Sequence, residues 1–230
     1  MWCDDLPPNS SWTSLWSGYI KCGKCDGIRT LDGLCPACGA ELPQATEQII
    51  RDDQGKEHVL PAAFYCGAET RYEDYVYLQL LEREWSRMGR DPASDGQLPH
   101  VTQSSMGASI VLLFWTYFES RIGQLLRDGL RHVPPRFLDD ALKRYSFIGV
   151  RLTKFYRIAF DSTYANDLES LGYADVAQHL TAVQRQRNAF VHGSPESIDD
   201  ALAISVVEML KREHEAWIAV YNLRAARAPS

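Results

Sequence analysis

Arg187 and His192 place two side chains that can act on a phosphate within one short stretch of the chain. An imidazole can accept and donate a proton near neutral pH, and a guanidinium can bind a phosphate through two hydrogen bonds. Gly193 and Pro195 follow, and because both residue types end helices, they predict that His192 is the last residue of a helix from about Tyr173. Basic residues in a last helical turn also complement the helix dipole. The pair is therefore either a site for cutting RNA without a metal or an ordinary helix end.

The helical geometry of this stretch poses a difficulty. Asn188 precedes His192 by four residues, hence lies on the same helical face, and can fix the orientation of its imidazole. Arg187 precedes His192 by five residues, which places the two about 140° apart on a regular helix. They can meet at one phosphate through the long reach of arginine, through distortion near Gly193 or through a second copy of the chain.

Four cysteines form two C-x2-C pairs with nine residues between them: Cys22, Cys25, Cys35 and Cys38. Two such pairs can place four thiolates tetrahedrally around one Zn²⁺, and a closed site of four sulfurs is structural rather than catalytic. Gly23 and Gly39 beside the ligands suit tight turns. Disulfides are disfavoured without a secretion signal, and a redox C-x-x-C normally occurs singly. Cys3 and Cys66 have no partner at ligand spacing and are interpreted as buried free thiols.

Composition and charge restrict the class of protein. The 230 residues are 45% hydrophobic and carry a net charge of −6, which excludes a nucleic-acid-binding surface over the whole molecule. The acidic start at residues 1–5 differs from the basic start of a signal peptide. The longest apolar run, Ile110 to Trp115, is too short to cross a bilayer. A cytoplasmic protein without membrane contact is therefore expected.

Hydrophobic residues recur at three- and four-residue spacing in several stretches and predict helices there. These helices are expected at 71–88, 103–131, 136–160, 173–192 and 198–227. A loop with a short helical turn is expected at 161–171, and Ser197 with Asp200 resembles a capping box. The fold class is mainly α, a C-terminal up-and-down helical bundle preceded by a small zinc-ribbon module. The expected units are a zinc-ribbon module with a short β-hairpin at 1–62, a connecting helix and linker at 63–100 and the bundle at 101–230.

The stretch from Arg187 to His192 resembles the R-x4-H signature of the HEPN family of all-α domains, including the polar Asn188 after the arginine. The resemblance extends over about Gln103 to Ala226. Tyr117-Phe118-Glu119-Ser120 is similar to an aromatic–Glu segment in the first helix of HEPN domains. Glu119 either orients Arg187 across the bundle or is a solvated charge.

The resemblance implies a metal-independent endoribonuclease, with Arg187, Asn188, His192 and Glu119 as catalytic residues. HEPN ribonucleases act as homodimers whose two R-x4-H motifs face each other, and serve as toxins or antiphage effectors. RNA is then the substrate, and a regulatory protein or antitoxin is a possible partner. Zinc would be structural, with no catalytic metal. Two alternatives stay open: a non-catalytic HEPN-like module that binds RNA or protein, and a DNA-associated zinc-ribbon adaptor.

A basic segment suits the phosphate backbone of such a substrate. Between residues 121 and 157 there are nine basic side chains against three acidic ones, Asp128, Asp139 and Asp140. The basic residues are Arg121, Arg127, Arg131, Arg136, Lys143, Arg144, Arg151, Lys154 and Arg157. The alternative is a solvated helical face without a ligand.

Overall fold

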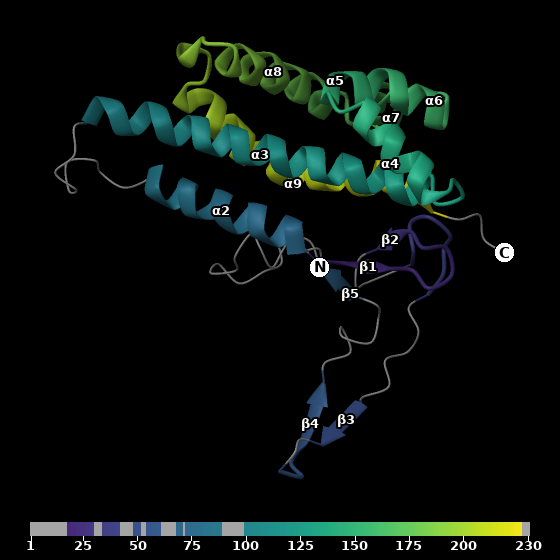
Figure 1. The fold of residues 1–230 in the computed structure, drawn as a ribbon. Coiled ribbons are helices and arrows are strands. Elements are labelled where there is room, and N and C mark those ends of the chain that lie inside the picture. The colour runs from purple at the N-terminus through teal and green to yellow at the C-terminus, as the bar shows by residue number, and fades with distance from the viewer. Residues whose placement is uncertain are drawn as a thin grey trace.

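The computed structural model describes residues 18–29, 34–41, 48–51, 54–60, 68–70, 72–88 and 99–226. This part of the chain is mainly helical and carries two small antiparallel sheets near its N-terminus (Figure 1). The predicted fold class, mainly α with a small four-cysteine module, is confirmed. Cys3, Cys66 and most of the expected linker before residue 99 lie outside the described residues.

The strands form two separate sheets. The first has the order β2-β1-β5, from β1 (Gly18–Lys21), β2 (Ile28–Arg29) and β5 (Ala68–Thr70). The second is a hairpin of β3 (Gln48–Arg51) and β4 (Glu57–Leu60), in which Gln48 pairs with Leu60. The predicted hairpin is therefore confirmed. Because β5 pairs with β1, residues beyond position 62 complete the sheet that carries the first cysteine pair.

The long helices α3 and α9 run beside each other, with α2 on one side of α3 and α8 on the other (Figure 1). Their contacts bury large aromatic side chains, among them Trp115, Phe118 and Trp217, and burial of such side chains is the main stabilising term of the bundle. The helices are α2 (Tyr72–Met88), α3 (Pro99–Gly129), α4 (Pro135–Arg144), α5 (Ile148–Val150), the π-helix η4 (Arg151–Phe155), α6 (Tyr156–Phe160), α7 (Tyr164–Ser170), α8 (Ala174–Val191), the 3-10 turn η5 (Pro195–Ser197) and α9 (Asp200–Ala225).

The predicted single helix over 136–160 is wrong, because the chain breaks after α4 and resumes as α5, η4 and α6. Arg151 stabilises the break: its Nε donates to the carbonyl oxygen of Tyr145 at 3.1 Å and its Nη2 to that of Leu142 at 3.4 Å. The rings of Tyr145 and Phe155 stack across it at 5.1 Å. These contacts satisfy the last carbonyl groups of α4, which a helix end otherwise leaves without partners.

Two smaller predictions also need correction. Within the expected loop 161–171, Thr163 accepts a hydrogen bond from the backbone amide of Asn166 and starts the full helix α7. Asp199 caps the N-terminus of α9, because its carboxylate accepts a hydrogen bond from the backbone amide of Leu202 at 2.8 Å. Ser197 instead donates to the carbonyl oxygen of Gln186, so the predicted capping box does not form.

A buried carboxylate fixes α7 against its neighbours. Asp167 is 3% exposed and accepts hydrogen bonds from Tyr156, Ser162 and Arg224 at 2.5–2.7 Å. Burial acts to raise the pKa of Asp167, but the hydrogen bonds from Arg224, Tyr156 and Ser162 outweigh it and hold this pKa below its usual value. The carboxylate is therefore charged in the folded chain at neutral pH and joins α6, α7 and α9.

Replacing this carboxylate tests its contribution. We expect Asp167→Asn to lower the free energy of unfolding by about 3 kcal/mol at pH 7, because removing one partner leaves the other charge poorly compensated. Since the folded pKa lies below the unfolded value, the pair stabilises above about pH 4 and its contribution is lost as the pH falls further. Urea unfolding at pH 7 and pH 3 measures both effects.

Asp175→Asn is the matched control, because Asp175 pairs with Arg212 at 3.1 Å on the surface, with side chains 50% and 41% exposed. Its loss should cost less than about 1 kcal/mol. Equal costs for the two variants at pH 7 would contradict the role given to Asp167.

Candidate functional site

The end of α8 has the geometry of a Schellman motif. The amide of Ser194 donates to the carbonyl oxygen of Ala189 at 3.0 Å, and that of Gly193 to Phe190 at 3.2 Å. Gly193 has a φ of +103°, which favours glycine. The predicted helix stop is therefore confirmed, with His192 as the exposed capping residue directly after the last helical residue.

Arg187 is hydrogen-bonded to the side chain of its neighbour in the chain. Its Nη1 donates to Oδ1 of Asn188 at 3.1 Å, and Asn188 lies four residues before His192. The side-chain Nε of Arg187 is buried and makes no hydrogen bond within the described part of the chain. The structure therefore joins the side chains of Arg187 and Asn188, but no hydrogen bond within the described part of the chain joins either of them to the imidazole of His192.

Glu119 has different partners from the predicted one. Its carboxylate accepts a hydrogen bond from Nε1 of Trp115, one turn earlier in α3, at 2.6 Å. Burial lowers the pKa of Arg151, and the negative charge of Glu119 partly offsets this effect. The described contacts of Glu119 therefore connect it with Trp115 and Arg151, while the described hydrogen bond of Arg187 goes to Asn188.

Arg121, the first residue of the predicted basic segment, does not lie on the surface. Its side chain is fully buried, and its Nη1 lies 3.8 Å from a carboxylate oxygen of Glu213 on α9. The guanidinium lies between the rings of Tyr117 and Trp217, 4.3 and 4.4 Å from their centroids. Arg121 is therefore a core residue that cannot bind a phosphate in the folded chain.

Three further basic residues of that segment are engaged within the chain. Arg127 pairs with Asp139 at 2.7 Å, Arg131 pairs with Asp26 at 3.5 Å, and Arg151 closes the break after α4. Within the segment 121–157, five basic residues are exposed and form no ion pair with a described residue: Arg136, Lys143, Arg144, Lys154 and Arg157. They extend from α4 to α6, so the basic surface is smaller than the sequence predicts.

The four predicted metal ligands converge. The sulfur atoms of Cys22, Cys25, Cys35 and Cys38 all lie within 4.8 Å of one another. The Cys22–Cys38 and Cys25–Cys35 sulfurs are 3.8 and 3.7 Å apart. Tetrahedral zinc with bonds of about 2.3 Å requires sulfurs about 3.8 Å apart. Four thiols at this spacing can hold a metal ion such as zinc, and they are too far apart for disulfides.

Each cysteine pair lies on a turn of the same design. The amide of Cys22 donates to the carbonyl oxygen of Gly27, and that of Cys35 donates to Ala40, both at 2.8 Å. The left-handed positions are Asp26, with a φ of 58°, and Gly39, with a φ of 69°. The expectation that Gly39 serves such a turn is confirmed, whereas Asp26 rather than Gly23 has this role in the first turn.

The thiols of Cys22 and Cys25 differ in pKa. Burial acts to raise the pKa of Cys22, but hydrogen bonds from the backbone amides of Lys24 and Cys25 lower it to about 7. Burial raises the pKa of Cys25 to about 12. A bound cation is therefore needed to hold all four sulfurs as thiolates at neutral pH.

The attachment of the ribbon to the helices depends on a residue that sequence reasoning missed. The side-chain amide of Asn222, near the end of α9, accepts from the amide of Ile28 at 2.6 Å and donates to its carbonyl oxygen at 2.8 Å. Ile28 is fully buried in the core of the helical bundle. Gly27 allows this approach, because a Cβ there would lie 2.9 Å from Oδ1 of Asn222. Asn222 thus pairs with β2 as another strand would.

No helix in the described ranges combines the length and apolar composition that crossing a membrane requires. Comparison of the chain with known protein families, with curated proteins and with solved structures finds no match.

Loss of one thiol should unfold the four-cysteine ribbon. We expect Cys35→Ser to lower the bound zinc of the purified chain severalfold and to expose the ribbon to proteolysis, because metal binding supplies the folding energy of so small a module. Far-UV circular dichroism should keep most of its helical signal, since α3, α8 and α9 have a core of their own. Cys66→Ser is the control and should retain its zinc. Less than about half a zinc per chain in protein purified without chelator would contradict the site.

Proposed function

We propose that the chain is a metal-independent endoribonuclease that cleaves RNA by attack of the ribose 2′-OH at a dimeric R-x4-H site. The observation that carries the proposal is the exposed His192 at the cap of α8, four residues after Asn188, whose side chain holds the guanidinium of Arg187 by a hydrogen bond. The resemblance to HEPN ribonucleases supports the same assignment.

The chemistry needs a base, an acid and a cation. The 2′-oxygen forms a bond to phosphorus while the bond from phosphorus to the 5′-oxygen breaks. One His192 takes the 2′ proton, and His192 of a second copy gives a proton to the departing 5′-oxygen. Arg187 stabilises the additional negative charge on the phosphate. Asn188 is a positioning residue that holds the guanidinium, and the products carry a 2′,3′-cyclic phosphate and a 5′-hydroxyl.

A second copy of the chain supplies what one histidine lacks, because a single imidazole cannot take and give a proton in the same step. The surface around His192 suits such a contact. Val191 is 52% exposed, and His192 and Gly193 beside it are exposed as well. A two-fold axis at this helix end would cover Val191 and bring two copies of Arg187 and His192 to one phosphate.

The four-cysteine ribbon has a supporting role in this proposal. It binds zinc for structure, stabilises the far end of α9 and acts in recognition or regulation. No catalytic metal takes part. The cellular role is that of a toxin or antiphage effector.

The helix end also favours a second function, binding of RNA or protein without cleavage. A Schellman motif with a basic last turn is complete as a structural unit and needs no chemistry to explain it. Catalysis in the presence of a chelator separates the two functions.

We expect the wild-type chain to cut labelled single-stranded RNA in EDTA, and His192→Ala and Arg187→Ala each to lose 10²–10⁴-fold in rate. His192 is exposed, so the thermal stability of His192→Ala should change little. Arg187 is half-buried, and circular dichroism therefore checks that Arg187→Ala is folded before its rate is compared. Gel electrophoresis gives the rate, and treatment with phosphatase and kinase identifies the fragment ends. A mixture of the two inactive variants should recover part of the activity if one site uses both copies.

His132→Ala and Arg83→Ala are matched controls, since both side chains are exposed, distant in sequence from the motif and not part of the basic surface. Their rates should equal that of the wild type. Unchanged cleavage by His192→Ala, or fragments with 5′-phosphates, would rule out this mechanism.

A further inference from the structure

A cavity of about 130 Å³ lies beside α8, two turns before the candidate catalytic residues, between α3, η4 and α7. Its walls are mostly aromatic or aliphatic and include Trp115, Leu152, Tyr164, Leu168 and Leu180. The polar residues of the lining are Thr153, Thr163, Thr181 and Gln184. A cavity of about 150 Å³ with apolar walls is known to hold benzene. The cavity is therefore of the size that suits one six-membered ring.

One polar group at the edge of the cavity can specify its ligand. The side-chain amide of Gln184 lines the cavity and makes no hydrogen bond within the described part of the chain. Gly149 makes room for it, because a Cβ on Gly149 would lie 2.8 Å from Nε2 of Gln184. The π-helix η4 follows and adds Leu152 and Thr153 to the wall. π-Helical turns are frequent at functional sites.

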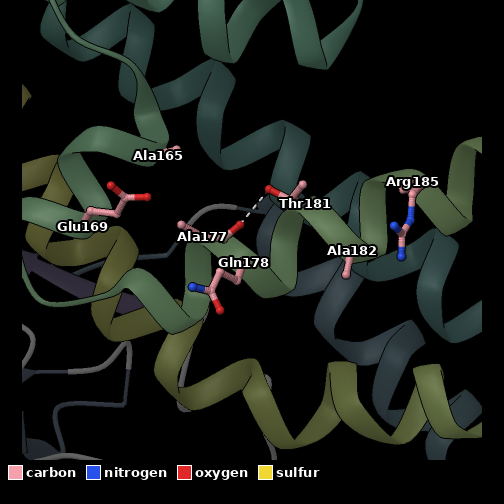
Figure 2. A pocket seen from close by; sticks show the side chains of 7 residues that line it. All are labelled: Ala165, Glu169, Ala177, Gln178, Thr181, Ala182 and Arg185. Carbon is pink, nitrogen blue, oxygen red and sulfur yellow. Dashed lines mark hydrogen bonds between the residues drawn. The ribbon is translucent and has the colours of Figure 1, made fainter.

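An exposed groove of about 320 Å³ lies next to the cavity, between α7 and α8 (Figure 2). Ala165, Ala177 and Thr181 line both spaces. Figure 2 shows Glu169 at one end of the groove and Arg185 at the other. Neither charge forms an ion pair with another described residue, so the guanidinium of Arg185 is available to an anion at the mouth.

We infer that the cavity binds a pyrimidine base and that the groove holds its ribose and phosphate, with Arg185 on the phosphate. Trp115 and Tyr164 offer aromatic contacts to the ring. The Gln184 amide has a donor and an acceptor side by side, which match the adjacent donor and acceptor on the edge of uracil or of cytosine. A purine has a second ring, which exceeds the size of the cavity.

The proposed nucleotide site and the candidate catalytic residues lie on the same helix, α8. Thr181, Arg185, Asn188 and His192 lie on one strip of the helix, three or four residues apart. Arg185 and His192 are separated by about 10 Å along the axis. A base in the cavity can therefore belong to the RNA that reaches His192, or to a free nucleotide. Binding of a free nucleotide does not depend on the proposed function. Binding of a base of the substrate RNA in this cavity rests on the proposed function.

Binding of free nucleotides tests the site without any cleavage. Calorimetric titration of the full chain with UMP, CMP, AMP and GMP should show the pyrimidine nucleotides binding at least about tenfold more tightly. Uridine should bind more weakly than UMP, and Arg185→Gln should remove that difference, whereas Arg157→Gln should not. Gln184→Leu should weaken UMP about tenfold.

Ala165→Trp should block the mouth and abolish UMP binding, because Ala165 is exposed and lines both the cavity and the groove. Ala201→Trp is the matched control, since Ala201 is likewise the exposed second residue of its helix. Absence of nucleotide binding, equal binding of purines, or unchanged binding in both Ala165→Trp and Gln184→Leu would overturn the proposal.

RNA cleavage then identifies the source of the base. If the base belongs to the substrate, UMP competes with RNA and Ala165→Trp slows cleavage. If UMP binds without competing, the ligand is a free nucleotide. If the wild-type chain cuts no RNA, the proposed function fails, while nucleotide binding is decided by the titration alone.

Discussion

The buried carboxylate of Asp167 is the interaction on which the arrangement around α7 depends. It joins Tyr156 of α6 and Arg224 of α9, and a buried carboxylate is costly unless all its oxygens are paired. The helix α7 therefore has one favourable position. In that position Tyr164 and Leu168 line the cavity beside α8. The shape of the cavity thus depends on an ion pair that contributes no atom to its walls.

Residue spacing in the sequence predicted correctly those features that depend only on residues close together in the chain. The positions of the main helices follow from apolar residues at three- and four-residue intervals, and the stop at Gly193 follows from its need for a positive φ. The four cysteines converge because each C-x2-C pair forms its own turn and needs one partner pair. Each of these features depends on neighbours within a few residues, which a sequence displays directly.

Features that depend on distant residues could not be predicted in this way. The spacing of apolar residues continues through Tyr145, because both α4 and α6 face one core. The hydrophobic pattern therefore does not reveal the break between these two helices. Arg121 resembles any surface arginine until Glu213 and Trp217, from the far end of the chain, enclose it. Asn222 has no signal of its own either, since its partner is the backbone of Ile28. The cavity, likewise, forms only where five helical segments meet, α3, α5, η4, α7 and α8.

The four-cysteine module and the candidate catalytic end lie at opposite ends of α9. The turn after Gly193 leads into α9 at Asp200, and the ribbon attaches at Asn222, about 33 Å farther along the axis (Figure 1). A side chain beside Ile28 is far too short to span that distance to a phosphate at His192 of the same chain. If two copies meet at His192, their ribbons point away from the axis. For the proposed ribonuclease, this arrangement leaves the ribbon a separate stretch of RNA or another protein to contact, and α9 and α3 connect it with the proposed site.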